Sequence, residues 1–177
     1  KTMTNRILLA VDGSQNASRA IDLAAQLASK LNANLFIVHV LMHGRPAAEL
    51  LHMAEVEHLV KEAQTVVSPG IAYVTGSHPE LLGGSRTDPR TARLISVVGD
   101  QIVANAKIRC AEQGVKNIKT SVRIGDYAEE ILNAAEQFNA DMIVIGSRGL
   151  GLLKTAVLGS VSQKVLHHAL CTVVTVR

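Results

Sequence analysis

Short apolar runs alternate along the chain with longer segments in which apolar residues recur every three or four positions. Runs of four to eight residues rich in Val, Ile and Leu predict β-strands. Most of them are apolar at consecutive positions, as is typical of strands buried on both faces of a parallel sheet. The predicted strands are Arg6–Val11, Asn34–Leu41, Asn117–Ile124, Asp141–Gly146 and Cys171–Val176.

Four amphipathic stripes lie between these strands and predict helices, because their apolar residues fall on one helical face. They run from Ala17 to Leu31, from Leu94 to Cys110, from Ala128 to Phe138 and from Val161 to Ala169. The second stops before Gly114, which suits a helix C-cap. Strands that alternate with helices predict an α/β domain with a parallel sheet covered by helices.

The segment 42–116 is much longer than one crossover between parallel strands needs. Part of it, Met53–Val67, carries a further helical stripe. Ser68–Arg90 is rich in glycine and proline and predicts a surface loop. We therefore expect one domain over residues 1–177, with a helical and loop insertion at about 43–92.

The composition excludes several classes of protein. Hydrophobic residues make up 47% of the chain and charged residues 19%, as in an ordinary globular protein. Aromatic residues are only 2% and the net charge is +3, which argues against nucleic-acid binding, since stacking platforms and basic runs are missing. The longest apolar run, Leu35–Met42, is interrupted by His39 and is far short of the ~20 residues that span a membrane.

The two cysteines, Cys110 and Cys171, lie in different predicted elements without the spacing of a metal or redox motif. We expect each to be a buried free thiol and the protein to be cytoplasmic, where thiols stay reduced. The histidines form no metal-ligand pattern, and His39 is expected to be a hydrogen-bonded core residue. No dedicated metal site is predicted.

Small and polar residues follow the predicted strands, at the edge where ligands of parallel sheets bind. They are Asp12-Gly13-Ser14, Gly125-Asp126 and Gly146-Ser147-Arg148-Gly149. Two interpretations stay open. The residues leave room for a flat, polyanionic ligand, or Asp12 and Ser14 simply cap the helix that follows them.

The strongest signal is the stretch from Gly146 to Ser162, in which a strand leads into a glycine loop and Gly159-Ser160 opens the last helix. Glycines let backbone N–H groups converge, and a helix N-terminus supplies free donors, so this order predicts a phosphate cradle. It is neither a Walker A loop nor a dinucleotide fingerprint, because Leu152-Leu153 replace Lys-Ser/Thr and the third glycine is missing.

The spacing Gly146-x2-Gly149-x9-Gly159-Ser160 resembles the ATP-binding signature of the universal stress protein family. The opening segment Arg6–Ser14 and the strand Asn34–Leu41 are similar to the family's first two strands, so the resemblance covers residues 5–42 and about 115–177. It implies a Rossmann-like, adenine-nucleotide-hydrolase-like fold with five parallel strands in the order 3-2-1-4-5. It also implies a homodimer paired through the last strand, Cys171–Val176.

The same resemblance implies roles in binding ATP, with Mg²⁺ arriving on the nucleotide. The backbone of Val40 would meet the adenine edge, Ala10 and Val11 would line the base pocket, and Asp12 would face the ribose or a phosphate-bound metal. The remaining nucleotide-binding residues implied are Gly146, Ser147, Arg148, Gly149, Gly159, Ser160, Val161 and Ser162. The chain departs from the family at Ala10, where proline is frequent.

Three hypotheses about function follow. The first is an ATP-binding, homodimeric regulatory module of the stress response. The second is a slow ATPase in which Asp12, Asp126 and Arg148 are candidates, although no compact catalytic constellation is visible and we assign no catalytic residue. The third is an interaction protein that uses the 42–116 insertion and no nucleotide.

Overall fold

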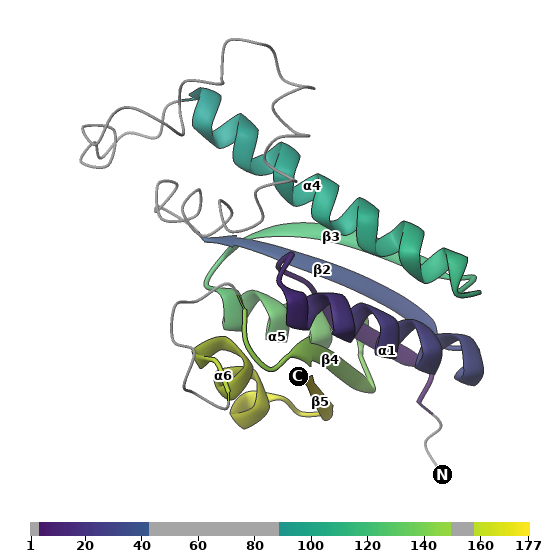
Figure 1. The fold of residues 1–177 in the computed structure, drawn as a ribbon. Helices are drawn as coiled ribbons and strands as arrows, with labels where there is room; N and C mark the ends of the chain where they lie inside the picture. Colours follow the sequence, from purple (N-terminus) through teal and green to yellow (C-terminus); the bar gives the residue numbers. More distant parts are fainter. Residues whose placement is uncertain (1–3, 43–88, 150–157) are drawn as a thin grey trace.

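The computed structural model describes residues 4–42, 89–149 and 158–177. In these ranges five parallel strands form one sheet in the order β3-β2-β1-β4-β5 (Figure 1). This order confirms the topology that the resemblance implied. The strands are β1 (Arg6–Ala10), β2 (Asn34–Met42), β3 (Ile118–Gly125), β4 (Met142–Gly146) and β5 (Thr172–Val176).

Helices cover both faces of the sheet (Figure 1). One face carries α1 (Gln15–Leu31) and α4 (Pro89–Glu112), and the other carries α5 (Tyr127–Phe138) and α6 (Ser160–His168). Among the described helices, none has the length and hydropathy that a membrane crossing requires.

Local sequence signals explain where the helices begin and end. Ser14 caps α1 by accepting a hydrogen bond from Ala17 N–H, and Asp126 caps α5 by accepting from the N–H groups of two residues of its first turn. Asn32 and Asn139 end the same two helices in the left-handed conformation, with φ of 50° and 52°.

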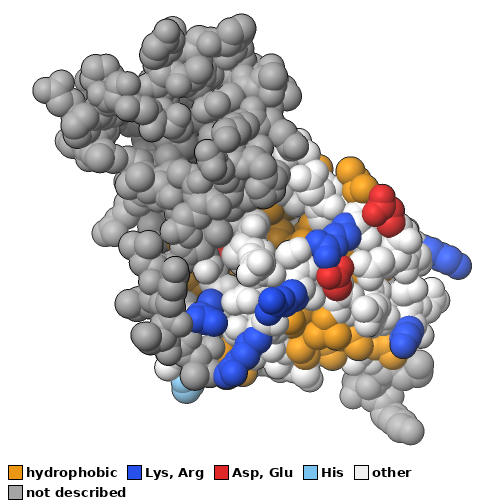
Figure 2. Space-filling model, viewed as in Figure 1, with side chains coloured by type: hydrophobic (Ala, Val, Ile, Leu, Met, Phe, Trp, Pro, Cys, Tyr) orange, Lys and Arg blue, Asp and Glu red, His pale blue; other side chains and the backbone are white. Residues whose placement is uncertain are grey.

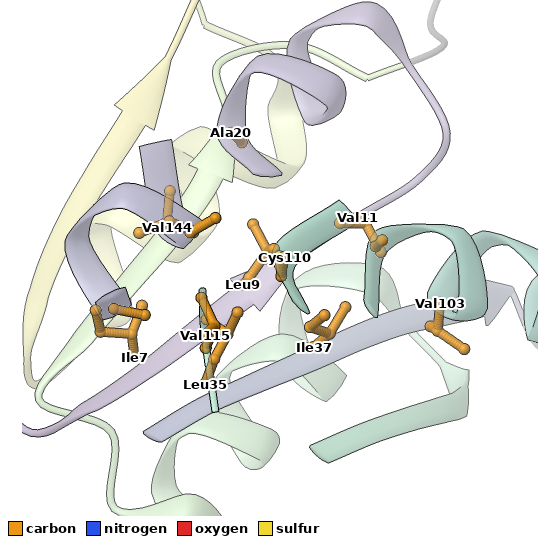
Figure 3. Packing of buried hydrophobic residues seen from close by; sticks show 14 of the residues in the cluster. Ile7, Leu9, Val11, Ala20, Leu35, Ile37, Val103, Cys110, Val115 and Val144 are labelled. Atoms are coloured by element: carbon orange, nitrogen blue, oxygen red, sulfur yellow. The ribbon is translucent and has the colours of Figure 1, made fainter. Parts of the chain in front are cut away.

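The alternation of side chains along each strand produces two hydrophobic cores. Ile7, Leu9, Leu35, Ile37 and Val144 point to the α1 and α4 face, where several are labelled in Figure 3. Their neighbours in sequence point to the α5 and α6 face. The face of α1 that meets the sheet consists of buried alanines, which let the helix approach the strands closely.

One expectation is corrected by the structure. The predicted loop Ser68–Arg90 was expected to extend to Arg90, but α4 begins at Pro89. Proline suits the first turn of a helix, where its missing N–H costs nothing. The insertion expected at about 43–92 stays a prediction, since most of it lies outside the described residues. The predicted helix Met53–Val67 and residues 68–88 lie outside the described residues.

Both cysteines are free, as expected. Cys110 is fully buried, and burial raises the pKa of its thiol to about 11, with the nearby Asp22 carboxylate as a smaller cause. Cys171 is only partly buried, contrary to expectation. It precedes β5, which lies at the edge of the sheet and pairs with β4 alone.

The chain enters β1 through a carboxylate clamp. Asp141 Oδ2 accepts hydrogen bonds from the backbone N–H of Asn5 at 3.0 Å and of Arg6 at 2.9 Å. The Arg6 guanidinium lies 3.6 Å from the other oxygen of this carboxylate. These contacts, with the Asn5 N–H first, hold the pKa of Asp141 below its ordinary value. The clamp therefore joins the starts of β1 and β4.

We expect Asp141→Ala to lower the free energy of unfolding by about 1 kcal/mol at pH 7, because two backbone donors lose their acceptor. A carboxyl whose pKa is lowered by folding stabilises the protein above its unfolded pKa of about 3.9, and this contribution disappears as the pH falls through the folded value. The deficit of the variant should thus vanish in acid. Urea unfolding at several pH values measures it, with exposed Asp100→Ala as the control.

Candidate functional site

The candidate site lies at the edge of the sheet where the strands end. β1 and β4 are neighbours in the sheet, yet the chain leaves β1 for α1 on one face and β4 for α6 on the other. Ligands of open α/β sheets bind in the crevice that such a reversal opens. The turn Asp12–Ser14 and the loop Ser147–Gly149 border this crevice.

Hydrogen bonds join these two segments, which are far apart in sequence. The Arg148 carbonyl accepts from Asn16 Nδ2 at 3.3 Å and from Ser14 Oγ at 3.5 Å. Asp12 Oδ1 accepts from Ser14 N–H at 3.0 Å and so stabilises the turn after β1. Ser14 caps α1, which confirms that interpretation of the turn, whereas the interpretation as part of a ligand site stays a prediction.

Asp12 and Gly149 lie against each other across the crevice. A Cβ atom added to Gly149 would lie only 2.3 Å from Asp12 Oδ2. The glycine therefore leaves the space that the carboxylate occupies. Any larger residue at position 149 would have to displace Asp12, the one acidic residue of the β1 turn.

Gly146 has a packing role. A Cβ atom on this residue would lie 3.0 Å from Ala17 N and 3.1 Å from the carbonyl carbon of Asn16, both in the backbone of α1. Gly146 thus lets the first turn of α1 approach the end of β4. The contact with ribose and phosphates that the resemblance implies for Gly146 stays a prediction.

The start of α6 is the third part of the site. Gly159 is the N-cap residue of this helix, with φ of −76°, a conformation that any residue adopts, and as a glycine it has no side chain to cap the first turn. An added Cβ would meet its nearest atoms only at ordinary distances of 3.5–3.7 Å. The backbone N–H groups of the first helical turn have no partners within a helix. Neither backbone conformation nor packing among the described residues therefore demands a glycine at position 159.

The four residues Gly159–Ser162 have different environments. Ser160 is exposed, Val161 packs partly into the α5 and α6 core, and Ser162 is buried. The Ser162 hydroxyl group donates toward two carbonyl oxygens, that of Ser147 at 2.7 Å and that of Gly159 at 2.9 Å. Gly159 N–H also donates to the Ser147 carbonyl at 2.7 Å. Ser147 therefore holds the glycine loop against the start of α6.

The backbone of Val40 points toward the crevice. The Val38 carbonyl accepts from Val11 N–H at 3.0 Å, so the N–H and carbonyl of Val38 face β1. Peptide groups alternate in direction along a strand, and those of Val40 therefore face the same way. Since β1 ends at Ala10, which is paired with Val38, the Val40 groups extend beyond that strand.

Three residues expected at the site have other contacts in the structure: Ala10, Val11 and Asp126. Ala10 and Val11 pack into the cores on opposite faces of the sheet, and their expected place beside the adenine base stays a prediction. Asp126 caps α5 and binds Lys164 Nζ at 3.2 Å, and its pKa is lowered mainly by the N–H of Glu129.

The segment 150–157 lies outside the described residues. Among those described, no three His, Cys, Asp or Glu side chains form a metal cluster.

Two contributors to the site are not apparent from the sequence. Asn16 binds the Arg148 carbonyl, and His39, expected in the core, is 3% exposed and lies with Nδ1 2.8 Å from the Val11 carbonyl. The core position of His39 is confirmed, but its partner depends on the strand register. An amide in the first turn of α1 was the only local signal for Asn16.

Comparison with known proteins identifies the family of this chain. The universal stress protein family matches residues 3–177. The curated "Universal stress protein YxiE" of Bacillus subtilis is 36% identical over 176 residues, which cover 99% of this chain and 100% of that protein. The match spans the β1 turn, the glycine loop and α6.

Solved structures share the fold at low identity. A universal stress protein in complex with cAMP has a TM-score of 0.60 at 20% identity, over 99% of this chain and 98% of that one. The universal stress protein of Archaeoglobus fulgidus in complex with dAMP has a TM-score of 0.60 at 18% identity, over 99% and 100%. Since the family match and the relative both span nearly the whole chain, this protein belongs to the universal stress protein family.

Proposed function

We propose that this protein binds ATP at the crevice between β1 and β4 and acts as a nucleotide-dependent regulatory module. The observation that carries the proposal is the meeting of three segments there: the Asp12 turn, the glycine loop after β4 and the uncapped start of α6. Family members of the same fold in complexes with cAMP and dAMP support an adenine nucleotide as the ligand.

The backbone of Val40 suits the adenine base. The Watson–Crick edge of adenine offers one acceptor, N1, beside one donor, the N6 amino group. The N–H and carbonyl of Val40 both face the crevice and supply the complementary pair. Guanine presents the opposite pattern there, with O6 as an acceptor, and would place like groups against each other. This pair therefore favours adenine.

The start of α6 suits the phosphates. The N–H groups of its first turn, which have no partners within the helix, and the partial positive charge of the helix N-terminus attract anions. Ser160 adds an exposed hydroxyl group, whereas the Ser162 hydroxyl is held by the Ser147 and Gly159 carbonyls. In this proposal Ser162 contributes its backbone N–H alone, and Arg148 and Gly149 border the phosphates.

Asp12 suits the ribose hydroxyl groups or a Mg²⁺ ion carried by the nucleotide. One of its oxygens accepts from Ser14 N–H, and the other lies beside Gly149. Mg²⁺ prefers oxygen ligands and is usually held by one or two carboxylates together with phosphates. A single carboxylate fits a metal that arrives with ATP.

A homodimer through β5 completes the proposal. β5 is an edge strand, and edge strands expose backbone groups that pair readily with another strand. Leu170, just before it, is fully exposed, and Val173–Val176 are only partly buried. Figure 2 shows hydrophobic side chains gathered below α1, along the β4 and β5 side of the sheet. A second copy of the chain would cover them, and sedimentation velocity would reveal the doubled mass.

Thermal unfolding with added nucleotide tests the binding proposal. A ligand that binds only the folded state stabilises it by about 2.7 kcal/mol at a hundredfold excess over Kd, which raises Tm by roughly 5–10 °C in a protein of this size. We expect this rise with ATP and Mg²⁺, and a much smaller one with GTP. Equal shifts would contradict the role of Val40, and no shift in protein freed of nucleotide would contradict the site.

A further inference from the structure

The parallel ladder of hydrogen bonds between β1 and β2 lacks the bond that would come next at its end. Val11 N–H donates to the Val38 carbonyl at 3.0 Å, as in a parallel ladder. The next bond of such a ladder would run from Val40 N–H to the Val11 carbonyl. The structure describes both residues, and the backbone hydrogen bonds between these two strands end at Val11 N–H.

The imidazole of His39 takes the place of that missing bond. Its Nδ1 lies 2.8 Å from the Val11 carbonyl oxygen. A carbonyl oxygen only accepts hydrogen bonds, so Nδ1 carries the proton and donates it. His39 is 3% exposed and lies on the α1 and α4 face of β2, directly beneath the end of β1.

Close packing holds the ring in this position. A Cβ atom added to Gly99 of α4 would lie 3.2 Å from His39 Cδ2 and 3.3 Å from Val122 Cγ1. Gly99 therefore lets α4 press against the imidazole, and Val122 of β3 lies on the same side. The ring has little room to turn away from the Val11 carbonyl.

We propose that His39 is a positioning residue for the base: by donating to the Val11 carbonyl, it keeps Val40 N–H free to bind adenine N1. This inference rests on the proposed function, because it concerns the same Val40 backbone group. The buried imidazole would thus act on ligand recognition indirectly, through the carbonyl of Val11 at the end of β1. The side chain itself touches no ligand.

Two variants separate this role from simple packing. His39→Leu keeps an apolar side chain but removes the donor, so the Val11 carbonyl is expected to recruit Val40 N–H. His39→Asn restores a donor, because Asn Nδ2 is the same number of bonds from Cα as His Nδ1. We expect ATP to bind His39→Leu about 3- to 10-fold more weakly, as for the loss of one hydrogen bond, and His39→Asn within about twofold of the wild type.

Hydrogen exchange of the Val40 amide in nucleotide-free protein gives a second readout that packing alone would not move. It should slow in His39→Leu and return to the wild-type rate in His39→Asn. Val115→Ala, at the opposite end of the strands, is the control for general destabilisation: it should lower Tm but leave both ATP affinity and Val40 exchange unchanged. If His39→Leu does not fold, Gly99→Ala replaces it in the test. Its added methyl group pushes on the imidazole, so its affinity for ATP should also be lower than that of the wild type.

The outcomes distinguish the two proposals. Wild-type protein that does not bind ATP overturns the proposed function and this inference together. Wild-type protein that binds ATP, with His39→Leu or Gly99→Ala binding it equally well, overturns the inference alone. Weaker binding with slower Val40 exchange in His39→Leu, both restored in His39→Asn, supports it.

Discussion

Replacing Gly146 by valine is expected to lower the free energy of unfolding by about 3 kcal/mol. The first added atom would lie 3.0–3.1 Å from backbone atoms of Ala17 and Asn16, and backbone cannot turn aside as a side chain can. Overpacking of this kind typically costs 1–3 kcal/mol, and a branched side chain lies at the upper end. Either α1 must move away from β4, or the turn that starts it must distort.

Chemical denaturation in the absence of nucleotide measures this effect. Gly159→Ala is the matched control, since it changes another glycine of the same sequence signature where an added Cβ meets only ordinary contacts. Its stability should stay within about 1 kcal/mol of the wild type, because φ is already compatible and the helix cap changes little. A Gly146→Val protein as stable as this control would show that α1 does not depend on the close approach.

Gly159→Val, unlike Gly146→Val, is expected to lose ligand affinity and to keep its stability. It should weaken ATP binding by at least about 100-fold while leaving the folded structure intact. The valine side chain would stand at the uncapped start of α6, where we propose that phosphates meet the free N–H groups. Loss of several charge-assisted hydrogen bonds, each contributing about 1.5–3 kcal/mol, accounts for this magnitude.

Isothermal titration with ATP and Mg²⁺ measures the affinity, and circular dichroism with Tm checks that the variant is folded. Ser160→Ala serves as the graded comparison, because it removes one exposed hydroxyl group and retains the backbone donors. It should lose no more than about tenfold in affinity. If Gly159→Val binds ATP as tightly as the wild type, the phosphates do not lie at α6.

The three glycines of the signature have different surroundings. Gly146 makes room for the backbone of α1, and Gly149 makes room for the Asp12 carboxylate. Neither the backbone angle of Gly159 nor its described neighbours require a glycine, and the close approach of phosphates at this position is our proposal. A spacing pattern treats the three alike, so these separate roles appear only when the neighbours of each are known.

Much of the fold could be predicted because it depends on residues near one another in the chain. The alternation of apolar runs and helical stripes predicted every strand and helix of the described ranges, within a few residues at the ends. The cap at Ser14 was similarly visible, since its partner Ala17 is three residues away. At Pro89 the prediction failed, because the same residue type suits both a loop and the first turn of a helix.

The site was predicted in part. Residues that follow strands meet at one edge of a parallel sheet, so Asp12 and the glycine loop could be placed together from the sequence. Asp126, which follows β3, also lies at this edge, but Lys164 from α6 binds its carboxylate. The packing of α5 against α6 determines that ion pair, and residues 38 positions apart give no local sign of it.

The sequence by itself determined the class of fold, the strand order through its family resemblance, and the segments that border the crevice. The class of fold and the bordering segments follow from periodicity, caps and spacing, which act over a few residues, whereas the strand order came from the resemblance alone. Only the tertiary structure decided which described groups at the crevice bind one another. His39 reaches the Val11 carbonyl and α1 reaches Gly146 because strand register and helix packing bring distant parts of the chain into contact.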